Sequence, residues 1–263
     1  MTSLITMFLS LLLINPVDIS DKKQNKWGQT GHRIVGDIAA DYLDKKAEMA
    51  ISKILGHESM AIASTWMDKI RSDSQYDHTH AWHWVTIPDG MTYAETDKNS
   101  NGDLIKAIRD ITQKLEGGNL SPENEAKNLK MLIHLIGDIH MPLHVGTGND
   151  RGGNQVDVNW FWESSNLHRV WDSGMINESQ LSYTELSNAV DYTSEEKIKT
   201  LQNSSVLDWA QESMQLRKQV YQIPENRDIN YEYMYRNWDT VQKRLRRAGV
   251  RLAGVLNKIY GGE

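Results

Sequence analysis

The 263-residue chain contains no cysteine. This absence excludes disulfides, thiolate zinc sites, cysteine nucleophiles and a bacterial lipid anchor on cysteine, so histidine, carboxylate or backbone groups must hold any metal. Positive charge is also scarce, since 29 Lys and Arg face 35 Asp and Glu and the net charge is −6. The deficit argues against a protein that grips nucleic acid through a basic face. It does not exclude an enzyme that binds phosphate through metal ions.

Long apolar runs are missing except at the N-terminus. Residues 4–14 form an apolar stretch of signal-peptide length that is too short to span a bilayer comfortably. We therefore expect residues 1–20 to be an export signal, with cleavage as late as residue 26, and the protein to be secreted or periplasmic. The alternative is a buried N-terminal helix. No other segment predicts a membrane span.

The rest of the sequence predicts an all-α protein with a single multi-helix domain over residues 27–263, because it shows neither an internal repeat nor a Pro/Ser-rich linker. Short segments at 81–87 and 155–161 favour strands, so we expect at most one short β-hairpin. Thr30 is expected to cap the first helix, and Ser121 the helix that begins at Pro122. Helical spacing or flanking signals place helices near 30–43, 46–55, 59–72, 102–115, 122–140, 167–175, 183–190, 195–201, 206–221 and 231–260.

One side of the last predicted helix is rich in arginine. The four residues are Arg244, Arg246, Arg247 and Arg251. A run of like charge on a helix is usually solvated, so we interpret this side as facing solvent and not as a binding site.

The segment 133–144, IHLIGDIHMPLH, places polar groups in an apolar helix. His134 and Asp138 lie four residues apart, so they share one helix face at about 6 Å. Pro142 breaks the helix and turns His144 back towards the same region. Burial of such groups is costly without compensation, which either a metal ion or a satisfied His–Asp pair provides.

A second pair repeats this pattern. His168 and Asp172 lie four apart in LHRVWD, residues 167–172. One pair is weak evidence, but two pairs with His144 beside the first favour a metal cluster built between helices.

Three shorter motifs complete the set: WGQTGH at 27–32, with His32, STWMD at 64–68, with Asp68, and WHW at 82–84, with His83. The ordered set WGxxGH, STWxD, WHW, HxxGDxHxPLH, GGN and NLHRVWD resembles the S1/P1 nucleases, which are zinc-dependent secreted phosphoesterases. The resemblance covers the chain from Trp27 to about Asp172. Plant and fungal members carry disulfides, so the absence of cysteine makes this chain resemble the bacterial members of the family.

The resemblance implies three zinc ions in a cleft between helices. It assigns Asp68, His83, His134 and Asp138 to the first ion, His32, Asp138 and the backbone amine and carbonyl of Trp27 to the second, and His144, His168 and Asp172 to the third. Asp68 and Asp138 are the implied catalytic carboxylates. Trp27 must be the first residue of the mature chain for its amine to bind. Three zinc ions against three aspartates leave the site positive although the chain is acidic.

The function implied is hydrolysis of single-stranded DNA and RNA to 5′-phosphorylated products, with 3′-nucleotidase activity, by a monomer without a stable protein partner. Trp84 is either a platform on which a base stacks or a core residue, and Asn154 contacts a base edge or orders its loop. His140, near the ligands, is interpreted as supporting them. The alternatives are a zinc phospholipase C and a non-catalytic zinc-binding protein with a degenerate site. The intact set of nine ligands argues against the latter.

Overall fold

The computed structural model describes residues 28–262 except residue 192, and it confirms the all-α prediction. The predicted export signal and Trp27 lie outside the described residues. The helices are α1 Gln29–Asp41, α2 Lys45–Leu55, α3 Met60–Ala63, α4 Trp66–Lys69, α5 Leu104–Glu116, α6 Pro122–Asp138, α7 Leu167–Arg169, α8 Met175–Glu178, α9 Tyr183–Val190, α10 Glu195–Gln202, α11 Val206–Val220 and α12 Tyr231–Tyr260. Within these residues no helix combines the length and apolarity that a membrane crossing requires.

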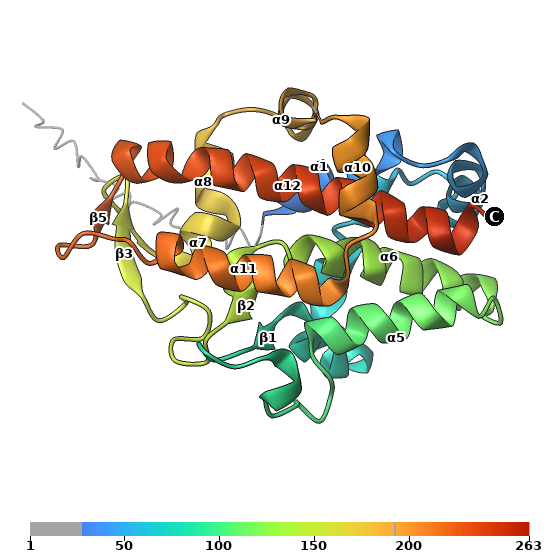
Figure 1. Ribbon diagram of the computed structural model, residues 1–263, viewed down its shortest axis with the longest axis horizontal. Helices are drawn as coiled ribbons and strands as arrows, with labels where there is room; N and C mark the ends of the chain where they lie inside the picture. The colour runs from blue at the N-terminus through green and yellow to red at the C-terminus, as the bar shows by residue number, and fades with distance from the viewer. Residues whose placement is uncertain (1–27, 192, 263) are drawn as a thin grey trace, which may run out of the picture.

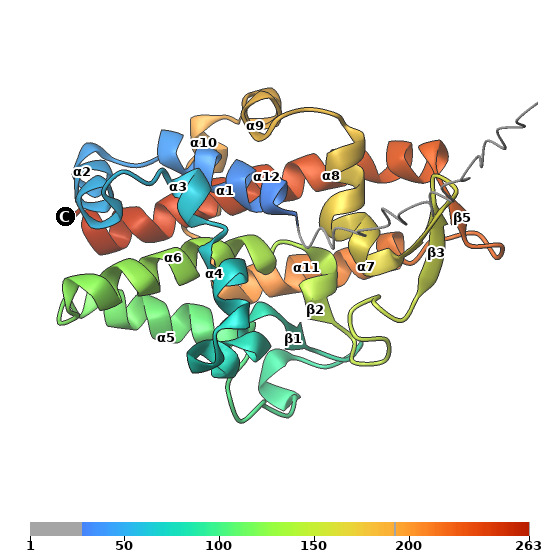
Figure 2. The same cartoon turned by 180° about the vertical axis from the view of Figure 1, so that it is seen from behind.

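Helix α6 is central to the packing. In Figure 1, α12 crosses the molecule from end to end, with α6 and α11 below it and α5 below them. α6 contacts α5, α12, α4 and α1, and every residue from Met131 to Asp138 is buried. The view from behind shows α1, α4, β2 and α7 gathered around the C-terminal part of this helix (Figure 2). The end of α6 is therefore the point on which several elements converge.

Short strands pair loops with one another near the C-terminus of α6. β1 Val85–Thr86 pairs in parallel with β2 Val145–Gly146, with Val85 opposite Val145. β3 Asp157–Trp160 and β4 Glu163–Asn166 form an antiparallel hairpin, which the second strand-prone segment predicted in part. β5 Asp228–Ile229 adds a parallel strand to β3 and was not expected. The strand-prone segment at 81–87 contains β1, but its pairing with β2 was not predicted. The β1–β2 register brings the segments that follow His83 and His144 side by side.

Several predicted helix boundaries are confirmed. Ser121 caps α6, accepting a hydrogen bond from the Asn124 backbone N–H, with Pro122 in the first turn. The cap expected at Thr30 is wrong, because α1 begins at Gln29 after Gly28 and Thr30 lies inside its first turn.

The helix expected over 59–72 is broken into α3, α4 and a 3-10 turn, η1 Ile70–Ser72. Ser64 Oγ donates to the Ala61 carbonyl at 2.7 Å, and Thr65 Oγ1 donates to the Ile62 carbonyl at 3.0 Å. Such local side-chain bonds compete with the helical hydrogen bonds, which explains the break. The other helical segments are the 3-10 helices η2 Ser74–His83, η3 Tyr93–Glu95 and η4 Pro142–His144 and the π-helix η5 Val170–Gly174.

The interpretation of the arginine-rich side of α12 as solvent-facing is wrong for Arg244, Arg246 and Arg251, which are buried. Arg244 and Arg251 bond to Glu212 on α11, and Arg244 Nε donates to the His140 carbonyl at 2.8 Å. The groups that accept hydrogen bonds from these arginines lie on other elements, and the spacing of residues along α12 cannot predict them.

The interpretation of His140 as a support for the ligands is also wrong. Its Nδ1 lies 2.7 Å from the Ile136 carbonyl and its Nε2 lies 3.0 Å from Nη1 of Arg251. Both ring nitrogens are therefore engaged with the backbone and with the arginine cluster, and not with a candidate ligand.

Candidate metal centre

Eight of the nine residues that sequence analysis assigned to metals line one cleft of about 710 Å³. They come from α1, α4, η2, α6, η4, α7 and η5, and are His32, Asp68, His83, His134, Asp138, His144, His168 and Asp172. The ninth, Trp27, lies outside the described residues. The backbone N–H of Gly28 donates to the Asp172 carbonyl at 2.9 Å, so the described chain begins beside the cleft.

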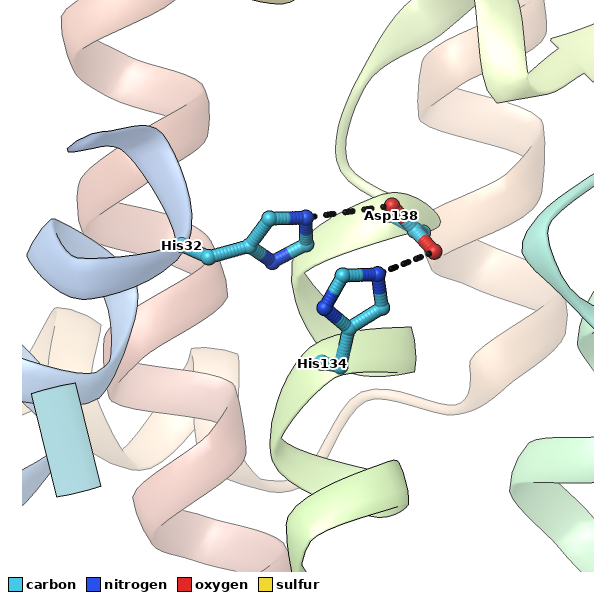
Figure 3. Close-up of side chains that lie close together, drawn as sticks. All are labelled: His32, His134 and Asp138. Atoms are coloured by element: carbon cyan, nitrogen blue, oxygen red, sulfur yellow. Dashed lines mark ion pairs between the residues drawn. The ribbon is translucent and has the colours of Figure 1, made fainter. Parts of the chain in front are cut away.

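Asp138 lies at the centre of the group. Its Oδ2 is 3.0 Å from His83 Nδ1 and 3.3 Å from His134 Nε2. Its Oδ1 is 3.4 Å from His32 Nε2 and 3.0 Å from His144 Nδ1. Figure 3 shows His32 and His134 reaching different oxygens of this carboxylate. A carboxylate that presents each oxygen to a different set of imidazoles can bridge two cations.

The donor atoms fall into three groups within which all atoms lie within 4.8 Å of one another. The groups are His32, His134 and Asp138; Asp68, His83 and His134; and His144, His168 and Asp172. The third group is the set that the resemblance gives to one ion. The first two share His134, and together they contain every side chain assigned to the paired ions.

Backbone carbonyls orient two of the histidines. His134 Nδ1 lies 2.7 Å from the Ser64 carbonyl, and His168 Nδ1 lies 2.7 Å from the Gly152 carbonyl. A carbonyl accepts only from an N–H, so each Nδ1 carries the proton and each Nε2 keeps its lone pair for a cation. The break between α3 and α4 thus places the Ser64 carbonyl where it orients a histidine.

Gly152 in the GGN motif is required by space and by conformation. Its φ is +62°, and a Cβ there would lie 2.3 Å from the Leu143 carbonyl oxygen. Any other residue would push the loop away from His168. The motif therefore supports the third group through its backbone.

The donor atoms are arranged to bind a cation and not to satisfy one another by hydrogen bonds. His83 Nδ1 faces His134 Nε2 at 3.1 Å, although both nitrogens also lie next to Asp138. Within the described chain, His83 Nε2 is buried without a hydrogen-bond partner. Buried imidazole nitrogens that face each other or lack a partner are costly, and a metal ion removes that cost.

The pKa values of Asp138 and His144 are shifted by the charges of their neighbours in the site. Burial by itself would raise the pKa of Asp138, but His134 and His144 outweigh it and hold that pKa well below its usual range. Burial would lower the pKa of His144, but the carboxylates of Asp138 and Asp172 raise it to about 10. Asp138 is therefore ionised and His144 carries a balancing proton, which metal binding has to displace.

The cleft also contains residues that sequence reasoning treated as uncertain. Trp84 is 45% exposed and lines the cleft, so it is not a core residue. Asn154 lines the cleft as well, and its Nδ2 donates to the Arg151 carbonyl at 2.9 Å, which orders the loop.

Three arginines that sequence reasoning missed line the same cleft: Arg71, Arg151 and Arg169. Their positions carried a signal, since Arg169 follows His168 directly and Arg151 precedes GGN. Isolated arginines are common on surfaces, however, and only the fold shows that these three share a cavity.

Comparison with known proteins agrees with this geometry. The family described as S1/P1 Nuclease matches residues 27–261, which extends well beyond the motifs at 27–172. Endonuclease 3 from Arabidopsis thaliana is 32% identical over 90% of both chains, and Endonuclease 4 from the same plant is 30% identical over 90% of both. Nuclease S1 from Aspergillus oryzae is 36% identical over 69% of this chain and 66% of its own.

The helical architecture, the cleft that gathers eight histidines and aspartates, and a family match over almost the whole described chain lead to one assignment. This chain belongs to the S1/P1 nuclease family, and it is a nuclease.

Proposed function

We propose that the enzyme is a zinc-dependent phosphodiesterase that cleaves single-stranded DNA and RNA to 5′-phosphorylated products and also acts as a 3′-nucleotidase. The observation that carries the proposal is the convergence of eight side chains from seven elements, with Asp138 at the centre. Imidazole nitrogen and carboxylate oxygen are the ligands that zinc uses when thiolates are absent. The relatives named nuclease and endonuclease support the reaction class.

The proposed cluster contains three zinc ions. Asp68, His83, His134 and Asp138 hold the first, His32, Asp138 and the backbone of Trp27 hold the second, and His144, His168 and Asp172 hold the third. The three observed groups of donor atoms support this division. The excess of positive charge would attract a phosphodiester to the cleft of an acidic protein.

The second ion depends on how the N-terminus is processed. We propose that residues 1–26 are removed on export and that the protein is secreted or periplasmic, which frees the Trp27 amine. The family match begins at residue 27, which supports this position. N-terminal sequencing of the exported protein checks it, and a mature chain that begins before residue 27 would contradict the amine ligand.

In the reaction, bound zinc supplies a Lewis acid that activates water near neutral pH and neutralises charge on the phosphate. Asp138 spans the paired groups with its two oxygens, and Asp68 completes the first group; these are the proposed catalytic carboxylates. The Ser64 and Gly152 carbonyls keep His134 and His168 in the tautomer that the cluster needs. These contacts preorganise the site before substrate arrives.

Preference for single strands follows from the depth of the site. His134 and Asp138 are 1% and 0% exposed, so the scissile phosphate must enter the cleft and its base must leave any duplex stack. Trp84, half-exposed in the same cleft, is the proposed surface on which the base stacks. Asn154 is proposed to contact the substrate while ordering its loop. We propose that the enzyme acts as a monomer.

Metal analysis and one set of assays test the proposal. The mature protein should contain close to three zinc ions per chain, and it should hydrolyse single-stranded DNA and RNA but lose this activity in chelator. A phosphatidylcholine emulsion is the parallel substrate. Hydrolysis of the lipid alone would favour a phospholipase C, and bound zinc without any hydrolysis would favour a non-catalytic protein. One zinc or none would contradict the three-ion cluster.

A further inference from the structure

Arg151 combines an unusual backbone with a position in the cleft. Its φ is +56°, in the left-handed region, and its side chain is exposed and lines the cleft. A long side chain in this conformation costs about 1 kcal/mol, whereas glycine adopts it freely. Gly152 and Gly153, which follow, are also left-handed. A strained residue kept where glycine would suit the backbone indicates a role for its side chain.

The loop holds the Arg151 backbone firmly. Asp150 accepts from the Gly153 N–H at 2.9 Å and from the Tyr221 hydroxyl at 2.6 Å. The Arg151 carbonyl accepts from Nδ2 of Asn154. The side chain therefore starts from a fixed point on the rim of the cleft.

The guanidinium of Arg151 is uncommitted. In the part of the chain that the structure describes, it takes part in no hydrogen bond or ion pair, in contrast to Arg244 and Arg251. A free guanidinium presents five donors in a planar fork that matches phosphate oxygens. The scissile phosphate belongs at the buried ligands, so an exposed arginine on the rim is placed for a different phosphate of the same strand.

We propose that Arg151 binds the substrate phosphate next to the scissile one and thereby favours polynucleotides over 3′-mononucleotides. The inference rests on the proposed nuclease function and deepens it. A mononucleotide has no neighbouring phosphate and gains nothing from this contact, whereas each oligonucleotide bound across the rim gains a charge-assisted pair.

The test compares two substrates in Arg151→Gly. Glycine suits φ +56°, and the relief of backbone strain offsets its greater conformational entropy in the unfolded chain, so the variant should be about as stable as the wild type. With zinc present, KM for a single-stranded ten-nucleotide DNA should rise about 10- to 100-fold, while kcat changes less and KM for a 3′-mononucleotide stays unchanged. Arg151→Lys should fall between, because it keeps the charge without the fork.

Binding without turnover provides a second readout. A phosphorothioate version of the DNA, which resists hydrolysis, should bind Arg151→Gly more weakly by the same factor in fluorescence anisotropy. The slope of log Kd against log salt should decrease by about 0.7, the loss of one phosphate contact on a single strand.

Arg227 offers a matched control. It is exposed with φ +59°, but it lies outside the residues that line the cleft, and its Nη1 donates to the Asp157 carbonyl. Arg227→Gly should leave both substrates unchanged. An equal effect of Arg227→Gly would overturn the inference in favour of general surface charge. An unchanged KM in Arg151→Gly, or equal losses on both substrates, would overturn it too while the proposed function stands. A wild-type enzyme that cleaves no nucleic acid would overturn both.

Discussion

Asp138 is the residue on which the proposed chemistry depends most. Four imidazoles reach its two oxygens at 3.0 to 3.4 Å, and its carboxylate stays ionised although it is fully buried. No other described side chain contacts so many of the proposed ligands. Its neighbour Gly137 has no side chain, which leaves room for the His32 ring, since a Cβ at this position would collide with it.

Asp138→Asn should reduce activity on single-stranded DNA by at least two to three powers of ten. Asparagine keeps the volume but removes the charge and one strong oxygen ligand, so the paired site loses metal or misplaces its water. Steady-state rates with zinc in excess check this. His57→Ala is the control, because His57 is exposed and lies outside the cleft. Near-full activity of Asp138→Asn would disprove the bridging role, and equal damage from His57→Ala would disprove the ligand set.

Gly137→Ala should lower both zinc content and rate. The new Cβ would lie 2.8 Å from His32 Nδ1, in a ring that stacks on His134 at 3.7 Å, so His32 must move away from Asp138. Metal analysis should show the loss of about one zinc per chain. Gly117→Ala at the end of α5 is the matched control, since its Cβ would meet nothing closer than 3.4 Å. Full zinc content in Gly137→Ala would show that the ring can shift without consequence.

At the scale of elements, the C-terminus of α6 is held by α11 and α12. Ser213 Oγ donates to the Ile139 carbonyl at 2.7 Å, and Arg244 donates to the carbonyl of His140. These contacts satisfy backbone groups that the end of a helix leaves unpaired, immediately after Asp138. Glu212 completes the network by pairing with Arg244, Arg247 and Arg251.

Glu212→Gln should lower the free energy of unfolding at pH 7 by about 3 kcal/mol, and by much less near pH 3. Burial would raise the pKa of Glu212, but the hydrogen bond and charge of Arg251, with the charges of Arg244 and Arg247, lower it to about 2 from 4.5. The folded state therefore holds this proton less tightly than the unfolded state. The stabilisation is complete above about pH 4.5 and is lost as pH falls towards 2.

Urea unfolding of metal-free protein at both pH values measures this difference without interference from zinc. Glu123→Gln, which removes an exposed partner of Lys127 on α6, should leave stability unchanged at either pH. A Glu212→Gln deficit that is the same at pH 7 and pH 3 would show that the charge of Glu212 is not responsible.

At the scale of the whole molecule, the site joins elements that are distant in sequence. His32 and Asp172 lie 140 residues apart, and the seven elements that bear ligands bring buried charges together. These elements also meet away from the cleft, because α1 and α4 pack directly against α6. Metal ions bound in the cleft would therefore add to a packed core and would not replace it.

Chelation should lower the melting temperature by about 10 °C without unfolding the protein at 25 °C. Metal that binds only the folded state stabilises it by mass action, and its removal leaves the buried aspartates and histidines to balance one another. Calorimetry in chelator, with zinc-saturated chelator as the control, measures the shift. The same melting temperature in both would contradict a metal-stabilised fold.

Sequence alone determined the set of candidate ligands and the local structure of most of the chain. Periodicity and caps predicted the longer helices, because amphipathic spacing and Ser121–Pro122 act within a few residues of chain. Pairs such as His134 with Asp138 share a helix face for the same local reason. The resemblance then joined the motifs into one ligand set, eight members of which the fold brings into one cleft.

Only the tertiary structure decided how distant groups meet. The burial of Arg244 and Arg251, the contact of His140 Nε2 with Arg251, and the contact of His134 Nδ1 with the Ser64 carbonyl all depend on partners from other elements. The cleft that Arg151 shares with His144 and His168 likewise forms only when loops pack together. A sequence pattern reports the face on which a side chain lies, whereas the partner on that face is chosen by the packing of the whole chain.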